Sequence, residues 1–201
     1  MFDAQLRPLI DRLLNPIGRE LVTLGVTANQ VTMIGAAFGL IAVGCAAAGL
    51  FYPALWFVIA NRVIDGLDGA VARASRSSDF GGYLDIVCDF IFYSAIPLAF
   101  AVARPETALA AAFLIFSFLG TATSFLGFAI LAEKHQVTTQ IRGKKAFYYL
   151  GGLTEGTETI LLFLAMLVWP DYFNLMAIVF GILCWVTTGT RISAAYRQFN
   201  D

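Results

Sequence analysis

Charged residues are scarce in this chain. Only 13% of its 201 residues are Asp, Glu, Lys or Arg, while 59% are hydrophobic, and the mean hydropathy is +0.75. This composition excludes an ordinary soluble domain and is typical of an integral membrane protein. The net charge of −1 gives no electrostatic basis for binding nucleic acid.

Residues that commonly form disulfides or ligate transition metals are also few. The three cysteines, Cys45, Cys88 and Cys184, lie far apart in apolar segments and form no CxxC pattern, so we interpret them as small packing residues. The one histidine, His135, has no Cys or His neighbour with which to share a metal ion. We also expect no signal peptide, because charges are mixed throughout residues 1–20.

Residues 1–20 instead predict an amphipathic helix that lies in the membrane interface. Their apolar side chains recur at spacings of three and four residues, which places them on one face of a helix. Three arginines, Arg7, Arg12 and Arg19, would then face the lipid headgroups. The apolar positions are Phe2, Leu6, Leu9, Ile10, Leu13, Leu14 and Ile17.

Six further segments are apolar and long enough to cross a bilayer, which takes about 20 helical residues. Turn signals separate them, and no domain linker or internal repeat is visible. We therefore predict an all-α membrane protein with a single domain over residues 1–201, in which six transmembrane helices within 28–196 follow the N-terminal amphipathic interfacial helix. The expected spans are 28–50, 52–74, 80–103, 107–131, 147–169 and 173–196.

The basic residues lie almost entirely on one side of this predicted bundle. Eleven of the thirteen Lys and Arg residues precede the first span, follow the second or fourth span, or lie near the end of the sixth. Because such residues favour the cytoplasmic side, both termini are expected in the cytoplasm. A bacterial inner membrane is the expected location.

Five aspartates interrupt the apolar pattern between residues 65 and 89. Asp65 follows Pro53, near the outer end of its span, by about 18 Å of helix. Asp85 and Asp89 lie about 7 and 13 Å from the cytoplasmic start of the next helix. Two antiparallel helices joined by a short turn would therefore bring Asp65, Asp68, Asp85 and Asp89 to a similar depth near the cytoplasmic face.

The spacing also places these carboxylates on common helix faces, since residues three or four apart are neighbours. Facing carboxylates in a low dielectric cannot all stay ionised without compensation, and ionisable side chains inside a membrane usually indicate function. Hard oxygen ligands suit Mg²⁺ or Mn²⁺, which carboxylates often hold together with substrate phosphates. Nearby small residues leave room for a ligand, and Arg73 suits a phosphate. Together they predict a cytoplasmic site for a phosphorylated nucleotide, flanked by lipid.

The pattern resembles the signature of the CDP-alcohol phosphotransferase family of membrane enzymes. That signature reads D-x-x-D-G-x-x-A-R, then a spacer, then G-x-x-x-D-x-x-x-D. The segment 26–35 is similar to the family's T-P-N-x-x-T element through Thr27, Asn29 and Thr32, so the resemblance covers nearly the whole chain. All eight fixed residues of the signature are present: Asp65, Asp68, Gly69, Ala72, Arg73, Gly81, Asp85 and Asp89.

The resemblance implies a role for each matched position. Asp65, Asp68 and Asp85 would hold Mg²⁺ or Mn²⁺, expected as two ions, on the diphosphate of a CDP-linked donor. Asp89 would be the general base for the incoming alcohol and a further contact to the second ion. The nucleotide pocket would be lined by Gly69, Ala72, Arg73 and Gly81 and completed by Asn29 and Thr32.

The implied reaction is attack by an alcohol hydroxyl on the phosphorus next to the lipid of CDP-diacylglycerol, with release of CMP. Its partners would be the CDP-linked lipid donor, an alcohol acceptor and membrane lipid. Family members resemble one another in pairing as homodimers, and a homodimer is expected here. An alternative within the family is transfer of a phospho-alcohol from a CDP-alcohol to diacylglycerol.

Three positions depart from the family's pattern. Seven residues separate Arg73 from Gly81, where eight are usual, and the change shortens the turn between the two helices. Asp79 occupies a place where many members have a basic residue, which removes a second phosphate contact. Ala28 replaces a frequent proline. None of these departures touches an expected metal ligand.

The acceptor alcohol stays open between glycerol 3-phosphate, a neutral or cationic alcohol such as inositol, serine or choline, and a lipid hydroxyl such as that of phosphatidylglycerol. Basic loops follow from topology alone, and Arg62 is as well placed to neutralise Asp65 as to bind an acceptor. The candidate acceptor contacts are Arg62, Arg142, Lys144, Lys145, Glu155 and Glu158.

Two functions of other classes fit parts of the sequence. Clustered membrane carboxylates and glycines also suit a transporter, although here the aspartates gather toward one face. A catalytically inactive relative that only binds nucleotide is the other alternative. Uptake without CMP release would favour a transporter, and absence of CMP release with every candidate alcohol would favour the inactive relative.

Overall fold

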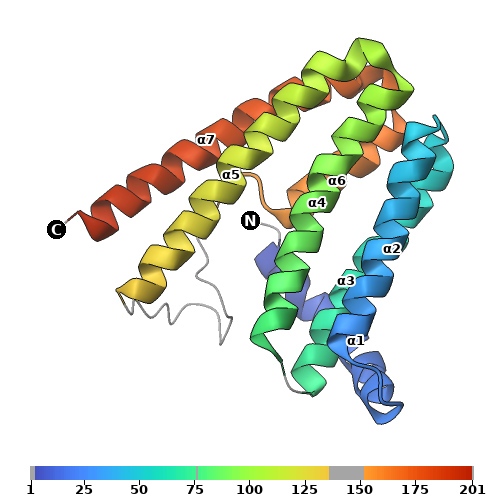
Figure 1. Ribbon diagram of the computed structural model, residues 1–201, viewed down its shortest axis with the longest axis vertical. Helices are drawn as coiled ribbons and strands as arrows, with labels where there is room; N and C mark the ends of the chain where they lie inside the picture. The colour runs from blue at the N-terminus through green and yellow to red at the C-terminus, as the bar shows by residue number, and fades with distance from the viewer. Residues whose placement is uncertain (1–2, 76, 136–151, 201) are drawn as a thin grey trace.

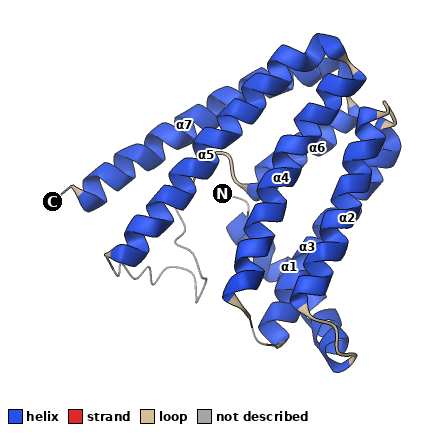
Figure 2. Ribbon diagram, viewed as in Figure 1, coloured by secondary structure: helices blue, strands red, loops and turns tan. Residues whose placement is uncertain are grey.

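The computed structural model describes residues 3–75, 77–135 and 152–200, and all the secondary structure in these ranges is helical (Figure 2). Short 3-10 turns, η1 (Pro105–Thr107) and η2 (Pro170–Tyr172), precede two of the helices. The helices are α1 (Asp3–Thr23), α2 (Ala28–Ala47), α3 (Phe51–Ala74), α4 (Asp79–Ala103), α5 (Ala108–Lys134), α6 (Gly156–Val168) and α7 (Phe173–Phe199).

Four of the described helices are long and apolar enough to cross a membrane: α2, α4, α5 with η1, and α7 with η2. Helix α3 coincides with the expected span 52–74 but carries the charged residues of the motif. The expected span 147–169 is only partly helical where it is described, because α6 begins at Gly156. Residues 152–155 form a cap in which the Glu155 carboxylate accepts a hydrogen bond from the Gly152 N–H at 3.0 Å.

Helices α2, α3 and α4 form one group, and α5 and α7 lie side by side and lead away from it (Figure 1). Helix α1 packs against α3, and α6 contacts α3. The turn from α3 to α4 is short, and these two helices run antiparallel, as the sequence predicts. The arrangement places the motif residues of α3 and α4 next to α1 and α2.

Two polar caps fix where helices near the motif begin. The Thr27 side chain accepts a hydrogen bond from the Gln30 N–H at 3.3 Å, and the Gln30 side chain accepts one from the Thr27 N–H at 2.9 Å. This reciprocal capping box satisfies two N–H groups that the first turn of α2 would otherwise leave unpaired. Ser78 caps α4 with a single hydrogen bond, since its hydroxyl accepts from the Gly81 N–H at 3.0 Å.

Glycines allow α2 to approach its neighbours closely. A Cβ on Gly35 would lie 3.3 Å from Ile64 of α3, and a Cβ on Gly39 would lie 3.1 Å from Phe92 of α4. Gly35 and Gly39 have the spacing of the GxxxG pattern, in which small residues allow neighbouring helices to pack closely.

A phenylalanine-rich core packs the helices together. Phe100 stacks on Phe51 with ring centroids 4.9 Å apart and on Phe173 at 4.4 Å. Phe163 of α6 meets Phe92 edge-on at 6.1 Å. Aromatic pairs at such distances add about 0.5–1.5 kcal/mol of stability beyond that from area burial. This core therefore helps to hold α3, α4, α6 and α7 together.

The contact between α1 and α3 gives the first prediction. A Cβ on Gly18 would lie 2.8 Å from the backbone carbon of Ala70, so Gly18→Ala must push α1 away from α3. We expect the substitution to lower the free energy of unfolding by about 1–3 kcal/mol, measured as thermal unfolding of the purified protein in detergent. Gly44→Ala is the matched control, because nothing lies within 4 Å of its added Cβ. Equal unfolding temperatures for both variants would show that the α1 contact contributes no stability.

Candidate active site

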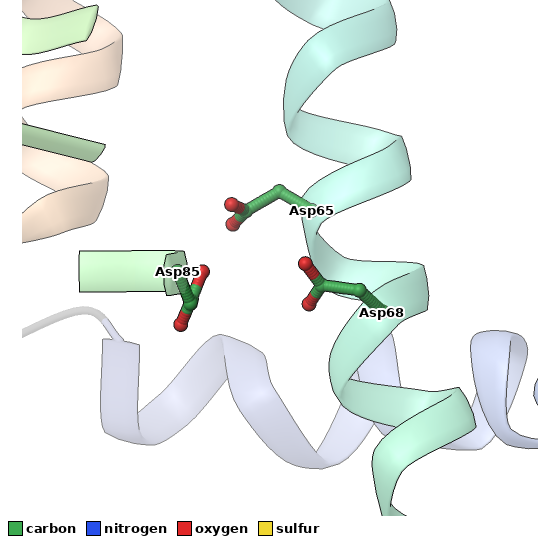
Figure 3. Close-up of side chains that lie close together, drawn as sticks. All are labelled: Asp65, Asp68 and Asp85. Atoms are coloured by element: carbon green, nitrogen blue, oxygen red, sulfur yellow. The ribbon is translucent and has the colours of Figure 1, made fainter. Parts of the chain in front are cut away.

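Three carboxylates meet between α3 and α4. Asp65 and Asp68 project from α3 and Asp85 from α4 toward a common space (Figure 3). One oxygen of each lies within 4.8 Å of the others. An all-oxygen set from three converging carboxylates fits a hard divalent cation such as Mg²⁺ or Mn²⁺, so the donor chemistry agrees with the predicted metal.

The most buried member of this cluster is held by α2. Asp68 is 7% exposed and Thr32 is also 7% exposed. The Thr32 hydroxyl donates to Asp68 Oδ2 at 2.7 Å, and the same hydroxyl lies 3.0 Å from the Ala28 carbonyl. The hydrogen bond fixes the orientation of the Asp68 carboxylate, so Thr32 acts on an expected metal ligand in addition to lining the pocket.

Asp89 lies one turn after Asp85 on α4, and its hydrogen-bond partners differ from those of Asp68. Its Oδ1 accepts from Arg62 Nη1 at 2.8 Å, and its Oδ2 lies 3.5 Å from the Tyr93 hydroxyl. The same Arg62 nitrogen is 3.6 Å from Asp65 Oδ2. Among the described residues, the four motif aspartates therefore divide into a cluster of three and a fourth that is paired with an arginine.

Asn61 is a site residue that the sequence analysis did not single out. It is 3% exposed, its Nδ2 donates to the Gly35 carbonyl at 2.7 Å, and its Oδ1 accepts from Arg62 Nε at 2.8 Å. In the sequence, this residue could have been noticed as an amide side chain within an apolar span, directly beside Arg62. Asn61 thus connects the backbone of α2 to the arginine that holds Asp89.

The structure also brings Asn29 and Gly81 together. A Cβ on Gly81 would lie 2.8 Å from Asn29 Oδ1 and 3.1 Å from the Ser78 hydroxyl. A larger residue at position 81 would therefore displace the Asn29 side chain from the start of α4. Asp79 is the first residue of α4, where an acidic side chain interacts favourably with the helix dipole.

Arg73 contacts α1. Its Nη2 donates to Asp11 Oδ1 at 2.7 Å and to Asn15 Oδ1 at 3.1 Å. A Cβ on Gly69 would meet Arg73 Nη1 at 3.2 Å, so the small residue at 69 leaves room for the guanidinium. Ala72 lies beside Arg73 near the end of the same helix. Asp11 and Asn15 are two further residues that the sequence analysis missed.

A cavity lies against the carboxylates and continues between α2 and α4. Asp65, Asp68, Asp89 and Arg62 line its polar part. The rest of its wall consists of Thr32 and the small or apolar residues of α2 and α4, together with Asn61 of α3: Thr32, Gly35, Ala36, Gly39, Leu40, Val43, Asn61, Cys88, Ile91, Phe92 and Ala95.

Among the remaining candidate acceptor residues, the described Glu155 and Glu158 do not line this cavity. Arg142, Lys144 and Lys145 lie outside the described residues. Glu155 and Glu158 form a capping box at the start of α6, in which Glu158 Oε2 accepts from the Glu155 N–H at 3.2 Å. Both glutamates therefore serve the start of this helix.

The fold and site define a helical membrane protein with a partly buried carboxylate cluster suited to a divalent cation. Residues 25–192 match the family model described as CDP-alcohol phosphatidyltransferase, and the chain belongs to this family. It is accordingly a transferase of phospholipid biosynthesis. The family model spans α2 to most of α7, including every residue of the three-carboxylate cluster.

Two relatives extend this comparison. The chain is 48% identical over 197 residues to the inner membrane protein YnjF of Escherichia coli strain K12, which covers 98% of this chain and 96% of that protein. It is 32% identical over 111 residues to the archaetidylinositol phosphate synthase of Pyrococcus horikoshii, which covers 49% of this chain and 53% of that protein. The similarity to an inner membrane protein agrees with an integral membrane location.

The fold is shared with the phosphatidylinositol phosphate synthase of Mycobacterium tuberculosis. Its crystal structure with CDP-DAG bound has a TM-score of 0.72 at 22% identity and covers 92% of this chain and 94% of that one. A second structure of that protein, in complex with manganese and citrate, has a TM-score of 0.70, also at 22% identity, and covers 91% and 88%. At this level of identity the likeness establishes the common fold.

The hydrogen bond from Thr32 to Asp68 gives the second prediction. Thr32→Val keeps the side-chain shape but removes the donor, so we expect Mn²⁺ binding to weaken about tenfold, as when outer partners of metal ligands are lost. Thr32→Ser should retain most of the affinity. Titration of Mn²⁺ into the purified protein, followed by electron paramagnetic resonance of the free ion, measures the change.

Thr123→Val is the control for this comparison. The exposed Thr123 hydroxyl bonds only carbonyls of its own helix, at Leu119 and Gly120. Wild-type affinity in Thr32→Val would mean that this hydrogen bond does not orient Asp68 for metal binding.

Proposed function

We propose that this protein transfers a phosphatidyl group from CDP-diacylglycerol to an alcohol hydroxyl and releases CMP. The observation that carries the proposal is the convergence of Asp65, Asp68 and Asp85 within 4.8 Å, with Asp89 one turn further along α4. Family membership supports the reaction class. The CDP-DAG-bound structure of the mycobacterial relative supports a CDP-linked lipid as the donor.

Mg²⁺ or Mn²⁺, as two ions, is the proposed cofactor, held by Asp65, Asp68, Asp85 and in part Asp89. The ions would supply Lewis-acid stabilisation of negative charge on the diphosphate and the leaving CMP. The manganese complex of the mycobacterial relative supports this choice. The side chain of Thr32 keeps the Asp68 carboxylate oriented toward the cluster.

Asp89 is the proposed general base. It accepts the proton of the alcohol hydroxyl as the oxygen forms a bond to the phosphorus next to the lipid. The bond from that phosphorus to the bridging oxygen of the diphosphate breaks, and its electron pair leaves with CMP. Asp89 lines the cavity, which gives an alcohol a place to approach it.

The nucleotide pocket is proposed to consist of Asn29, Thr32, Gly69, Ala72, Arg73 and Gly81. Arg73 contacts Asp11 and Asn15, so a donor phosphate that reaches it has to replace or share these partners. Arg142, Lys144, Lys145, Glu155 and Glu158 stay proposed acceptor contacts, with Arg62 considered separately below.

The proposed membrane arrangement has six spans, with α3 and the segment containing α6 as the second and fifth. Helix α1 would lie in the interface, since Ile10, Leu13 and Ile17 are exposed on it as an interfacial helix requires. Both termini and the mouth of the site would face the cytoplasm, in keeping with the distribution of basic residues. A homodimer in a bacterial inner membrane is the proposed functional form.

The decisive experiment, and the third prediction, is an acceptor screen. Purified protein is incubated with CDP-diacylglycerol, Mn²⁺ or Mg²⁺ and a panel of alcohols, and lipid products are identified by mass spectrometry. We expect metal-dependent CMP release with one acceptor class. Asp68→Asn and Asp85→Asn should each abolish turnover through loss of metal binding. Diacylglycerol supplied with a CDP-alcohol tests the opposite direction of transfer.

A correctly folded wild-type protein that releases no CMP with any acceptor and either metal would refute the proposed activity. Uptake of a substrate into liposomes without CMP release would instead support a transporter.

The fourth prediction separates the base from the metal ligands. Asp89→Asn keeps the side-chain shape but removes the proton acceptor, so turnover should fall by about 100-fold or more. Binding of CDP-diacylglycerol in the presence of Mn²⁺, measured by calorimetry, should stay close to wild type. Full turnover in Asp89→Asn would show that another group accepts the proton.

A further inference from the structure

Arg62 lies within the site and is held on several sides. Its Nε donates to Asn61 Oδ1 at 2.8 Å, and its Nη1 donates to Asp89 Oδ1 at 2.8 Å. Its guanidinium carbon lies 5.0 Å from the centre of the Phe92 ring. The side chain is only 17% exposed, so these contacts fix its position.

The anchor of this arrangement lies on another helix. Asn61 donates to the Gly35 carbonyl of α2 at 2.7 Å, and it is 3% exposed. It also lies close to Gly39, since a Cβ on that glycine would be 3.2 Å from Asn61 Nδ2. The backbone of α2 therefore fixes the position of Asn61. Asn61 in turn fixes the position of the Arg62 guanidinium, which orients one oxygen of Asp89.

We propose that Arg62 is a positioning residue that holds Asp89 at the acceptor side of the carboxylate cluster and balances the charge there, and that it does not bind the acceptor. This inference rests on the proposed role of Asp89 in phosphatidyl transfer. It resolves the two roles that the sequence leaves open for Arg62 in favour of the carboxylates.

Geometry favours positioning over acceptor binding. To bind the phosphate of an acceptor, Arg62 would have to break its ion pair with Asp89. That would leave a largely buried carboxylate without its counter-charge, which is strongly unfavourable. The nitrogen that contacts Asp89 is also 3.6 Å from Asp65, so the same positive charge faces a member of the three-carboxylate cluster. Removing the charge of Arg62 should therefore slow the reaction but strengthen metal binding.

Two substitutions separate the charge of Arg62 from its shape. Arg62→Lys keeps the positive charge, but a lysine cannot hold Asn61 and Asp89 together through a planar fork. Arg62→Gln removes the charge as well. If Arg62 only filled space or stabilised the fold, both variants would weaken metal binding along with turnover.

The fifth prediction is tested with Mn²⁺ alone on the purified full chain, followed by electron paramagnetic resonance of the free ion. Arg62→Gln should bind Mn²⁺ at least about fivefold more tightly than wild type, because a positive charge beside the cluster is gone. Arg62→Lys should bind it within about twofold of wild type, since the charge remains. Unchanged or weaker Mn²⁺ binding in Arg62→Gln would overturn the inference.

The second readout is turnover with CDP-diacylglycerol and the alcohol that gives the most CMP with wild type. At saturating alcohol, kcat should fall about 100-fold or more in Arg62→Gln, the loss expected when a general base is misplaced. In Arg62→Lys it should fall about tenfold, as geometry alone is lost. The KM for the alcohol should change little in either variant. A raised KM with wild-type kcat would instead identify Arg62 as an acceptor contact and overturn the inference.

Arg104→Gln is the matched control. Arg104 also donates to carboxylates, at 3.1 Å to Glu106 and 2.9 Å to Asp171, but it lies at the far end of α4 from the motif. It should change neither Mn²⁺ binding nor kcat. If wild type itself gives no turnover with any alcohol, the proposed function fails, and Mn²⁺ binding by Arg62→Gln still decides whether Arg62 is the counter-charge of the cluster.

Discussion

The structure depends on how a mostly apolar helical bundle accommodates several carboxylates in one place. Unpaired charges are expensive in such surroundings, so each aspartate needs a partner from a neighbouring helix or a bound cation. Asp68 accepts a hydrogen bond from Thr32 of α2, and Asp89 pairs with Arg62 of α3. Helix α2 supplies Thr32 and, through the Gly35 carbonyl, the anchor of Asn61, which holds Arg62. Its close packing on α3 and α4 is permitted by Gly35 and Gly39. The small residues of α2 are thus as much part of the site as the aspartates.

Residues outside the motif orient the residues within it. The signature lies on α3 and α4, yet its side chains contact Asp11 and Asn15 of α1 and Thr32 of α2. Its Gly81 lies close to Asn29 of α2. Helix α1 is therefore joined to the site through Arg73 as well as through the close contact of Gly18 with Ala70. A displacement of α1 would move the one motif arginine expected to face the donor phosphates.

The sequence predicted much of this arrangement from periodicity and depth. The helices fall close to the expected spans, and the rise per residue brought Asp65, Asp68 and Asp85 together without knowledge of the fold. It did not predict that α6 starts at Gly156, because hydropathy does not distinguish a helix from an apolar stretch that ends in a side-chain cap at Glu155. Nor did it predict Asn61 between Gly35 and Arg62, since contacts between helices depend on how each is rotated, and a single sequence leaves that rotation undetermined.

Charge balance links metal binding to donor binding. The four motif aspartates and Arg62 together carry a formal charge of −3, so the site alone repels an anionic diphosphate. Arg62 lies 2.8 Å from Asp89 and 3.6 Å from Asp65 and offsets only part of this negative charge. Two divalent ions would reverse the sign of the whole group and turn repulsion of the diphosphate into attraction. Binding of divalent ions by these aspartates would therefore favour binding of the donor, in keeping with sites where carboxylates and substrate phosphates share Mg²⁺.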